Sequence, residues 1–171
     1  MEQRKNLRLK GYDYSNSGLY FVTICTFEKK YSLSYITDRR DSPCGCPQVI
    51  LTGLGKICKA NLFNIEKLFN IKVVNYIIMP NHIHLIIEVK EHNARTGASP
   101  VPTVSAIIGA YKSLVYNKWL DTCGENNQIV GKIWERSFYD HIIRDDEDLY
   151  FRQRYIDENP LRWCLKINKR E

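Results

Sequence analysis

The spacing of apolar residues along the chain predicts seven regular elements. Short runs rich in β-branched and aromatic residues are typical of buried strands. Apolar residues that recur three or four positions apart instead predict helices packed on a sheet. The predicted strands are residues 19–27, 72–79, 82–89 and 137–144, and the predicted helices are residues 52–69, 103–120 and 145–158.

Residues that favour turns or end helices separate these elements. Pro80-Asn81 predicts a tight hairpin, because proline cannot donate to a strand ladder and asparagine tolerates turn geometry. Residues 121–131 are expected to form a loop, and Asn159-Pro160 is expected to end the last helix. The order β, α, β, β, α, β, α predicts an α+β fold, a ferredoxin-like split βαβ sandwich with a mostly antiparallel sheet.

Length and composition describe one globular unit. A chain of 171 residues predicts a single domain over 1–171, with a polar N-terminal arm (1–18) and a C-terminal tail (160–171). No apolar run is long enough to span a bilayer, and no apolar segment follows the polar N-terminus, so a cytoplasmic protein is expected. Its cysteines are then thiols, with Cys25 and Cys58 as small core residues. Cys44 and Cys46 lack the second pair that a zinc site needs.

The charge balance is mildly basic. Lys and Arg exceed Asp and Glu by 25 − 19, a formal net charge of +6. This favours an anionic partner, nucleic acid first. The same charge also fits a small protein that binds no polyanion.

His82 and His84 form the most informative local pattern. Residues two apart on a strand point to the same face, so both imidazoles project together and Ile83 points the other way. Such a pair suits two ligands on one divalent metal. An accidental polar pair on an exposed sheet face is the alternative.

Tyr155 and Asn159 lie four residues apart, on one face of the last predicted helix. A helix packed on the histidine face of the sheet would bring both to that place. The Tyr155 phenol is suited to nucleophilic attack and a covalent intermediate. From the residues alone, however, Tyr155 is one of 11 tyrosines, and the ordinary role of Asn159 is to end the helix.

Seven ordered segments between Leu9 and Trp163 together carry a family resemblance. They resemble the single-tyrosine HUH (IS200-like) transposases, in which two histidines flank a bulky hydrophobic residue, and more narrowly the bacterial REP-associated tyrosine transposases. The segments are GYDY (11–14), YFVTICT (20–26), YIIMPNHIH (76–84), GASP (97–100), AYKS (110–113), WERSFYDHIIR (134–144) and YIDENP (155–160).

The resemblance implies roles for five residues. His82 and His84 match the metal ligands, and Tyr155 matches the nucleophile. Asn159 occupies the place of a third ligand, where glutamine is expected, so the third ligand stays open. His141 matches a recurrent histidine that contacts metal, scissile phosphate or DNA, or else is hydrogen-bonded within the sheet.

The resemblance also implies a reaction. Hairpin-bearing single-stranded DNA is cleaved with Mg²⁺ or Mn²⁺, Tyr155 forms a 5′-phosphotyrosine link, and a second 3′-hydroxyl then rejoins the strands. Such a protein is expected in the cytoplasm, nucleoid-associated when bound to DNA, as a monomer or a homodimer. Basic side chains that could hold the DNA backbone are Arg4, Lys5, Arg8, Lys10, Lys112, Lys118, Arg144, Arg152 and Arg154.

Two other functions stay open. One is a catalytically inactive module that binds structured DNA or RNA, which the asparagine at position 159 and the modest charge favour. The other is a metal hydrolase acting on small substrates through zinc on the two histidines, although no catalytic carboxylate lies near His84 on the same face.

Overall fold

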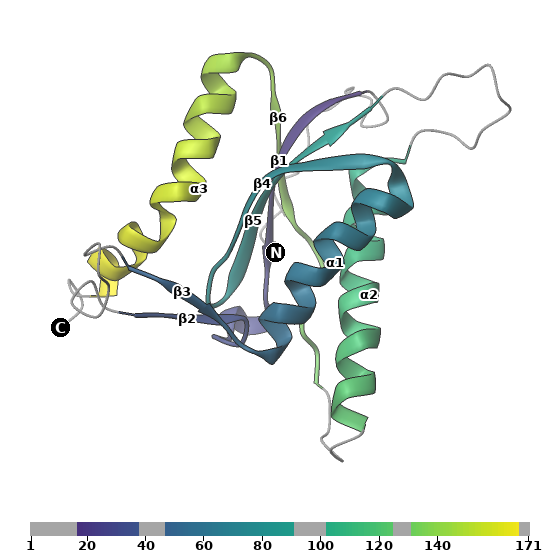
Figure 1. Cartoon of the computed structure of the whole chain (residues 1–171), viewed down its shortest axis with the longest axis vertical. Helices are drawn as coiled ribbons and strands as arrows, with labels where there is room; N and C mark the ends of the chain where they lie inside the picture. Colours follow the sequence, from purple (N-terminus) through teal and green to yellow (C-terminus); the bar gives the residue numbers. More distant parts are fainter. Residues whose placement is uncertain (1–16, 38–46, 91–101, 125–130, 168–171) are drawn as a thin grey trace, which may run out of the picture.

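A four-stranded antiparallel sheet forms the centre of the computed structural model, which describes residues 17–37, 47–90, 102–124 and 131–167. The strand order is β4-β5-β1-β6, so β5 and β1 are the two central strands (Figure 1). The strands are β1 (Gly18–Cys25), β4 (Ile71–Ile78), β5 (His82–Val89) and β6 (Tyr139–Ile143).

Helices cover both faces of this sheet. α1 (Gly53–Phe69) and α2 (Val104–Gly124) lie on one face, and α3 (Asp146–Ile167) lies on the other (Figure 1). Alternate residues of β5 divide between the layers: Leu85 joins the large core under α1 and α2, and Ile86 joins the small core under α3. The element and strand orders confirm the predicted ferredoxin-like α+β fold.

Local details differ from the sequence prediction. β2 (Ser34–Ile36) and β3 (Val49–Leu51) form a separate hairpin that the pattern did not predict, and the short 3₁₀ turn η1 (Phe27–Lys29) follows β1. α2 continues to Gly124, into the segment predicted as a loop, and its last turn buries Cys123. None of the helices in these described ranges is long and apolar enough to cross a membrane.

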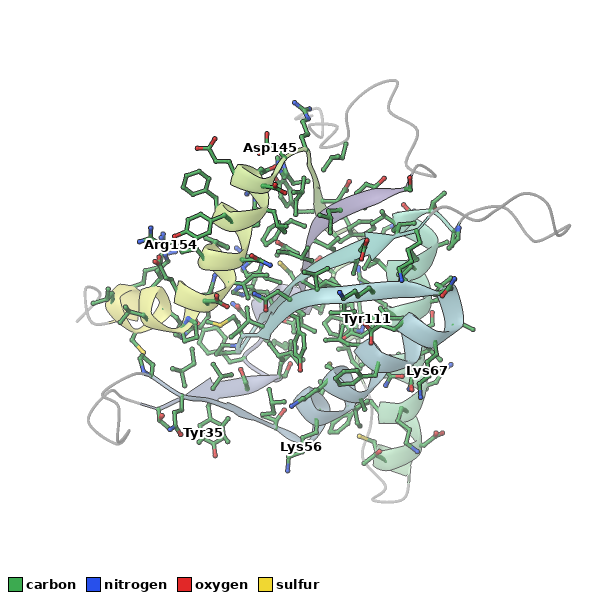
Figure 2. The ribbon with its side chains drawn as sticks, turned by 45° about the horizontal axis from the view of Figure 1, so that its top comes forward. Tyr35, Lys56, Lys67, Tyr111, Asp145 and Arg154 are labelled. Atoms are coloured by element: carbon green, nitrogen blue, oxygen red, sulfur yellow. The ribbon has the colours of Figure 1, made fainter. Side chains whose placement is uncertain are left out.

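α3 runs through Pro160, so the predicted helix end at Asn159-Pro160 is wrong. Proline removes one intrahelical hydrogen bond, but its fixed φ is helical, and a helix can continue past it with a bend. The ribbon of α3 changes direction near its C-terminal end (Figures 1 and 2). Asn159 and Pro160 are both buried, and this packing offsets the lost bond. The predicted tail is therefore helical as far as Ile167.

The first turn of α1 packs against the main chain that precedes β2. The Thr52 side chain caps the helix by accepting a hydrogen bond from the Gly55 amide, at 3.1 Å. The same hydroxyl and the Thr52 amide donate to the Leu33 carbonyl oxygen, at 2.9 and 3.0 Å. A Cβ atom at Gly55 would overlap this oxygen.

Replacing Gly55 by alanine should therefore destabilise the protein, by roughly 1–3 kcal/mol or more, because the backbone oxygen it meets cannot move freely. Urea unfolding followed by circular dichroism measures the change. Gly109→Ala is the matched control: that helical glycine has open space around its Cβ position, so the substitution should stabilise the protein by roughly 0.5–1 kcal/mol. Equal unfolding free energies for the two variants would contradict this packing.

Candidate active site

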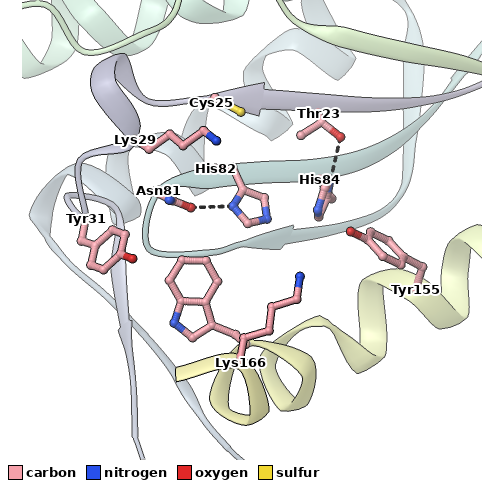
Figure 3. A pocket seen from close by; sticks show the side chains of 10 residues that line it. Thr23, Cys25, Lys29, Tyr31, Asn81, His82, His84, Tyr155 and Lys166 are labelled. Carbon is pink, nitrogen blue, oxygen red and sulfur yellow. Dashed lines mark hydrogen bonds between the residues drawn. The ribbon is translucent and has the colours of Figure 1, made fainter. Parts of the chain in front are cut away.

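An open cavity of about 470 Å³ lies between the α3 face of the sheet and α3 itself (Figure 3). It is lined by both histidines of β5 and by Tyr155 of α3, so the structure brings together three of the five site residues predicted from the sequence. The described residues that line it are Thr23, Cys25, Lys29, Tyr31, Asn81, His82, His84, Tyr155, Trp163 and Lys166. Cys25 thus borders the cavity and is only half-buried, instead of being a core residue as predicted.

The two histidines are held side by side with defined orientations. Their ring centroids are 4.5 Å apart. His82 Nδ1 donates to Asn81 Oδ1 at 2.7 Å, since an amide oxygen can only accept. His84 Nδ1 bonds to the hydroxyl of Thr23, its cross-strand partner, at 2.8 Å. Each ring therefore has its Nδ1 engaged, and the Nε2 atoms are left for other contacts.

Burial keeps both imidazoles neutral at physiological pH. It lowers the pKa of His82 to about 4, and the ammonium groups of Lys166 and Lys29 add to this effect. It lowers the pKa of His84 to about 3, with a further contribution from His82. The Nε2 atom of His84 is buried and has no hydrogen-bond partner, which leaves a buried polar atom unsatisfied.

These features fit a divalent metal on two Nε2 atoms. Neutral imidazoles whose Nδ1 atoms are hydrogen-bonded are common metal ligands in proteins, because the hydrogen bond at Nδ1 fixes the tautomer and the ring orientation. Within the described ranges, however, no group of three His, Cys, Asp or Glu side chains could hold a metal. Asn159 is 6% exposed and is not among the described residues that line the cavity. Water or substrate would have to complete the coordination shell.

Tyr155 reaches the cavity from the middle of α3. Its ring centroid lies 5.1 Å from that of His84 and 6.0 Å from that of Phe21, both edge-to-face. The Arg162 guanidinium lies 5.7 Å from the centroid of the same ring. With 38% of its surface exposed, the side chain is held in place and remains accessible to a substrate.

His141 lies outside the cavity lining, in a separate polar cluster. Its Nε2 bonds to Asp148 Oδ2 at 2.6 Å, and Arg152 Nε donates to the other oxygen of Asp148 at 3.0 Å. Although burial opposes the effect, these two bonds hold the pKa of Asp148 below its usual range. Arg152 also lies over the Phe21 ring. The cluster ties β6 to the first half of α3.

The predicted DNA-contacting residues are divided between the two faces. Lys112 and Lys118 lie on α2, across the sheet from Tyr155, and the Lys112 ammonium donates to the main-chain oxygens of Glu135 and Ser137 at 2.9 and 3.0 Å. Arg144 is exposed between β6 and α3. Arg4, Lys5, Arg8 and Lys10 lie outside the described residues.

Arg154 points away from the sheet on the outer side of α3 (Figure 2). It pairs with Glu158 at 2.5 Å, and Arg162 pairs with the same carboxylate at 2.7 Å. Arg152 and Arg154 thus lie on the helix that carries Tyr155, and each is paired with a carboxylate of that helix. Contact of any of these residues with DNA stays a prediction.

The sequence analysis did not assign seven of the ten described lining residues to the site: Thr23, Cys25, Lys29, Tyr31, Asn81, Trp163 and Lys166. The Trp163 ring lies 6.0 Å from that of His82 and 5.4 Å from that of Tyr31. A signal for Trp163 did exist, because it follows Tyr155 at eight residues and Asn159 at four, on one helical face. Trp163 was not placed on this face because the helix was predicted to end at Asn159-Pro160.

Comparison with known proteins gives a family and two relatives. The family model described as "Transposase IS200 like" matches residues 47–159. An uncharacterized protein of Haemophilus influenzae is 30% identical, and the match covers 95% of this chain and 91% of the relative. A second H. influenzae protein, provisionally named a REP-associated tyrosine transposase, is 28% identical over 88% of this chain and 74% of its own length.

Two solved structures share the fold. One is a REP-associated tyrosine transposase bound to a REP hairpin, with a TM-score of 0.60 over 91% of this chain and 74% of that one. The other is a Deinococcus radiodurans protein provisionally described as a transposase, with a TM-score of 0.51 over 88% of this chain and 95% of that one. Each is 16% identical to this chain, so the likeness concerns the fold alone.

Burial of two neutral histidines predicts that stability decreases in mild acid. In the unfolded chain a histidine binds a proton below about pH 6.5, whereas the folded pKa values are about 4 and 3. The unfolded state then binds more protons, so the free energy of unfolding should fall as the pH drops below 6.5, by up to roughly 1.4 kcal/mol per pH unit and histidine. Urea unfolding with a chelator present, between pH 7.5 and 4.5, measures it. His84→Gln should make the free energy of unfolding depend less on pH. An unchanged slope would contradict the lowered pKa of His84.

Proposed function

Because the chain belongs to the IS200-like transposase family, we propose that it cleaves and rejoins hairpin-bearing single-stranded DNA, with Tyr155 as the nucleophile. One observation carries the proposal. The accessible side chain of Tyr155 and the imidazole of His84, whose buried Nε2 has no hydrogen-bond partner, line one open cavity, with the two rings 5.1 Å apart. A phosphate in that cavity can meet a nucleophile and a metal ligand together.

The chain's own residues orient and polarise this site. Asn81 and Thr23 hold the imidazoles of His82 and His84 with Nε2 free. A divalent metal on these atoms, Mg²⁺ or Mn²⁺, would polarise the scissile phosphate and neutralise its charge. The aromatic contact with Phe21 fixes the Tyr155 side chain beside the histidines. Holding nucleophile and phosphate together replaces a bimolecular encounter by an effectively unimolecular one.

The reaction is a balanced exchange of phosphodiester bonds. The Tyr155 oxygen loses its proton and bonds to phosphorus, the bond from phosphorus to the 3′-oxygen breaks, and the 3′-oxygen takes up a proton. The product is a 5′-phosphotyrosine link and a free 3′-hydroxyl. Attack by another 3′-hydroxyl reverses the step and rejoins strands, so no nucleotide cofactor is consumed.

The substrate class rests on two kinds of support. One relative is provisionally named a REP-associated tyrosine transposase, and a structural neighbour of that name is bound to a REP hairpin. In this chain, Arg152, Arg154, Arg162 and Lys166 lie on the same helix as Tyr155, and the three arginines, now paired with carboxylates of α3, could exchange these partners for a phosphate backbone. We expect the DNA to approach the α3 face of the sheet.

A catalytically inactive module for structured DNA or RNA is the second candidate. The burial of Asn159 away from the cavity lining favours it, because the predicted third ligand does not reach the histidines. Such a protein would bind hairpins and cleave none.

Tyr155→Phe should bind hairpin DNA with unchanged affinity but form no covalent adduct, because it lacks only the attacking oxygen. The assay uses a pool of hairpin oligonucleotides with randomised single-stranded flanks and Mn²⁺, and adducts are resolved on a denaturing gel. Tyr150→Phe is the control: Tyr150 is 58% exposed on the same helix and is not among the residues that line the cavity. An adduct that persists in Tyr155→Phe would overturn the assignment, and binding without any wild-type adduct would favour the inactive module.

Metal binding should depend on the histidine pair. His84→Ala should weaken Mn²⁺ binding at least about tenfold, because it removes one of two ligands. His141→Ala should leave it unchanged, since His141 is paired with Asp148 outside the cavity. Titration followed by electron paramagnetic resonance, with hairpin DNA present, measures both. An equal loss in the two variants would place the metal elsewhere.

A further inference from the structure

The cavity has two chemically different ends. Successive ring centroids run from Tyr155 to His84 at 5.1 Å, to His82 at 4.5 Å, to Trp163 at 6.0 Å and to Tyr31 at 5.4 Å. Tyr155 and Tyr31 therefore lie at opposite ends, with the histidines between them (Figure 3). The proposed reaction uses the Tyr155 end and assigns nothing to the other end.

At the far end of the cavity, the end at Tyr31, two aromatic side chains lie outside the hydrophobic core. Tyr31 is 67% exposed, Trp163 is partly exposed, and neither belongs to the hydrophobic clusters of the described residues. The two rings meet edge-to-face. Exposed aromatic rings beside a phosphate site are the usual stacking partners of unpaired bases.

Two lysines give this cavity its charge. Lys29 and Lys166 line it, and its described lining residues include no Asp or Glu. Neither lysine forms an ion pair with a carboxylate in the described parts of the chain. Lys29 and Tyr155 lie on opposite sides of His82, whereas Lys166 extends from α3 below the histidine pair (Figure 3). Two lysines that meet no carboxylate among the described residues make this cavity favourable for an anion.

The turn that carries Lys29 is strained and firmly anchored. Glu28 and Lys29 have φ values of 54° and 52°, in the left-handed region that non-glycine residues rarely adopt. The Glu28 amide donates to the Glu135 carboxylate at 3.0 Å, and the Thr26 hydroxyl donates to the Lys30 carbonyl at 2.8 Å. Strain of this kind persists only where the surroundings hold it, and it recurs at functional sites.

Phosphoryl transfer adds a directional constraint. The attacking and leaving oxygens lie roughly in line with the phosphorus between them. With Tyr155 attacking from the His84 side, the leaving 3′-oxygen emerges on the His82 side. That is the side where Lys29, Trp163 and Tyr31 lie.

We propose that the far end of the cavity is the subsite for the leaving nucleotide, the one whose 3′-oxygen is released. Its base stacks on Trp163 and Tyr31, and the Lys29 ammonium stabilises the 3′-oxygen as negative charge develops there and supplies its proton. Lys166 contacts the non-bridging oxygens of the scissile phosphate. Lys29 regains its proton from water, and no further reactant is needed. This subsite rests on the proposed DNA cleavage by Tyr155.

A sulfur leaving group isolates the role of Lys29. The probe is the hairpin oligonucleotide that gives the wild-type adduct, with its 3′-bridging oxygen replaced by sulfur at the mapped cleavage position. A thiolate leaves without protonation, so Lys29→Gln should form adduct about 100-fold more slowly than wild type on the oxygen substrate and nearly normally on the sulfur substrate. Lys166→Gln should be slow on both, and Lys59→Gln, an exposed lysine on α1, slow on neither.

Stacking is tested without chemistry, in the Tyr155→Phe background. The probe carries 2-aminopurine as the base of the leaving nucleotide, whose fluorescence is quenched on stacking. Trp163→Ala should relieve the quenching and weaken binding by roughly 10- to 100-fold, and Trp163→Phe should largely restore both. Phe151→Ala, which removes an exposed aromatic ring of the same helix outside the cavity lining, should change neither.

The outcomes separate the two proposals. No wild-type adduct on any hairpin would overturn the cleavage reaction and the subsite with it. If wild type forms the adduct and Lys29→Gln slows adduct formation equally on the oxygen and sulfur substrates, only the proposed role of Lys29 at the leaving oxygen is overturned. Unchanged quenching in Trp163→Ala would overturn the stacking role.

Discussion

The two-residue alternation of β5 is the constraint on which the site depends. This central strand is covered on both faces, so every second residue must suit a different layer. Ile83, Leu85 and Ile87 fill the core under α1 and α2, and His82 and His84 consequently face α3. A shift of one residue would bury both imidazoles among aliphatic side chains, at the cost of two unsatisfied polar groups. Packing of the core thus enforces the position of the histidine pair.

Burial and hydrogen bonding then set the chemistry of that pair. Desolvation holds the pKa values of both imidazoles far below neutrality, so they offer lone pairs instead of positive charge. Thr23 and Asn81 are hydrogen-bonded to the Nδ1 atoms, which leaves the Nε2 atom of each ring for another contact. α3 contributes Tyr155 at one end and, past Pro160, Trp163 and Lys166 further along. A single bent helix therefore supplies the proposed nucleophile and much of the proposed substrate surface.

The sequence predicted what depends on local pattern and missed what depends on distant contacts. The strand His82–Val89 was predicted with its observed bounds, because a proline turn opens it and a continuous apolar run follows. The extent of α3 was mispredicted, because the proline rule weighs a local hydrogen bond and ignores the burial of Asn159 and Pro160. Tyr31 and Trp163 lie far apart in the chain and meet only in the fold. No local pattern could indicate such a contact.

The most direct test of the account is to locate the covalent bond itself. The wild-type protein is incubated with the hairpin pool and Mn²⁺, digested with nuclease and protease, and mapped by tandem mass spectrometry. We expect a nucleotide 5′-phosphate on Tyr155, with a free 3′-hydroxyl on the released strand. The modification on Tyr31, which borders the same cavity, or on Tyr139 or Tyr150 outside it, would contradict the account.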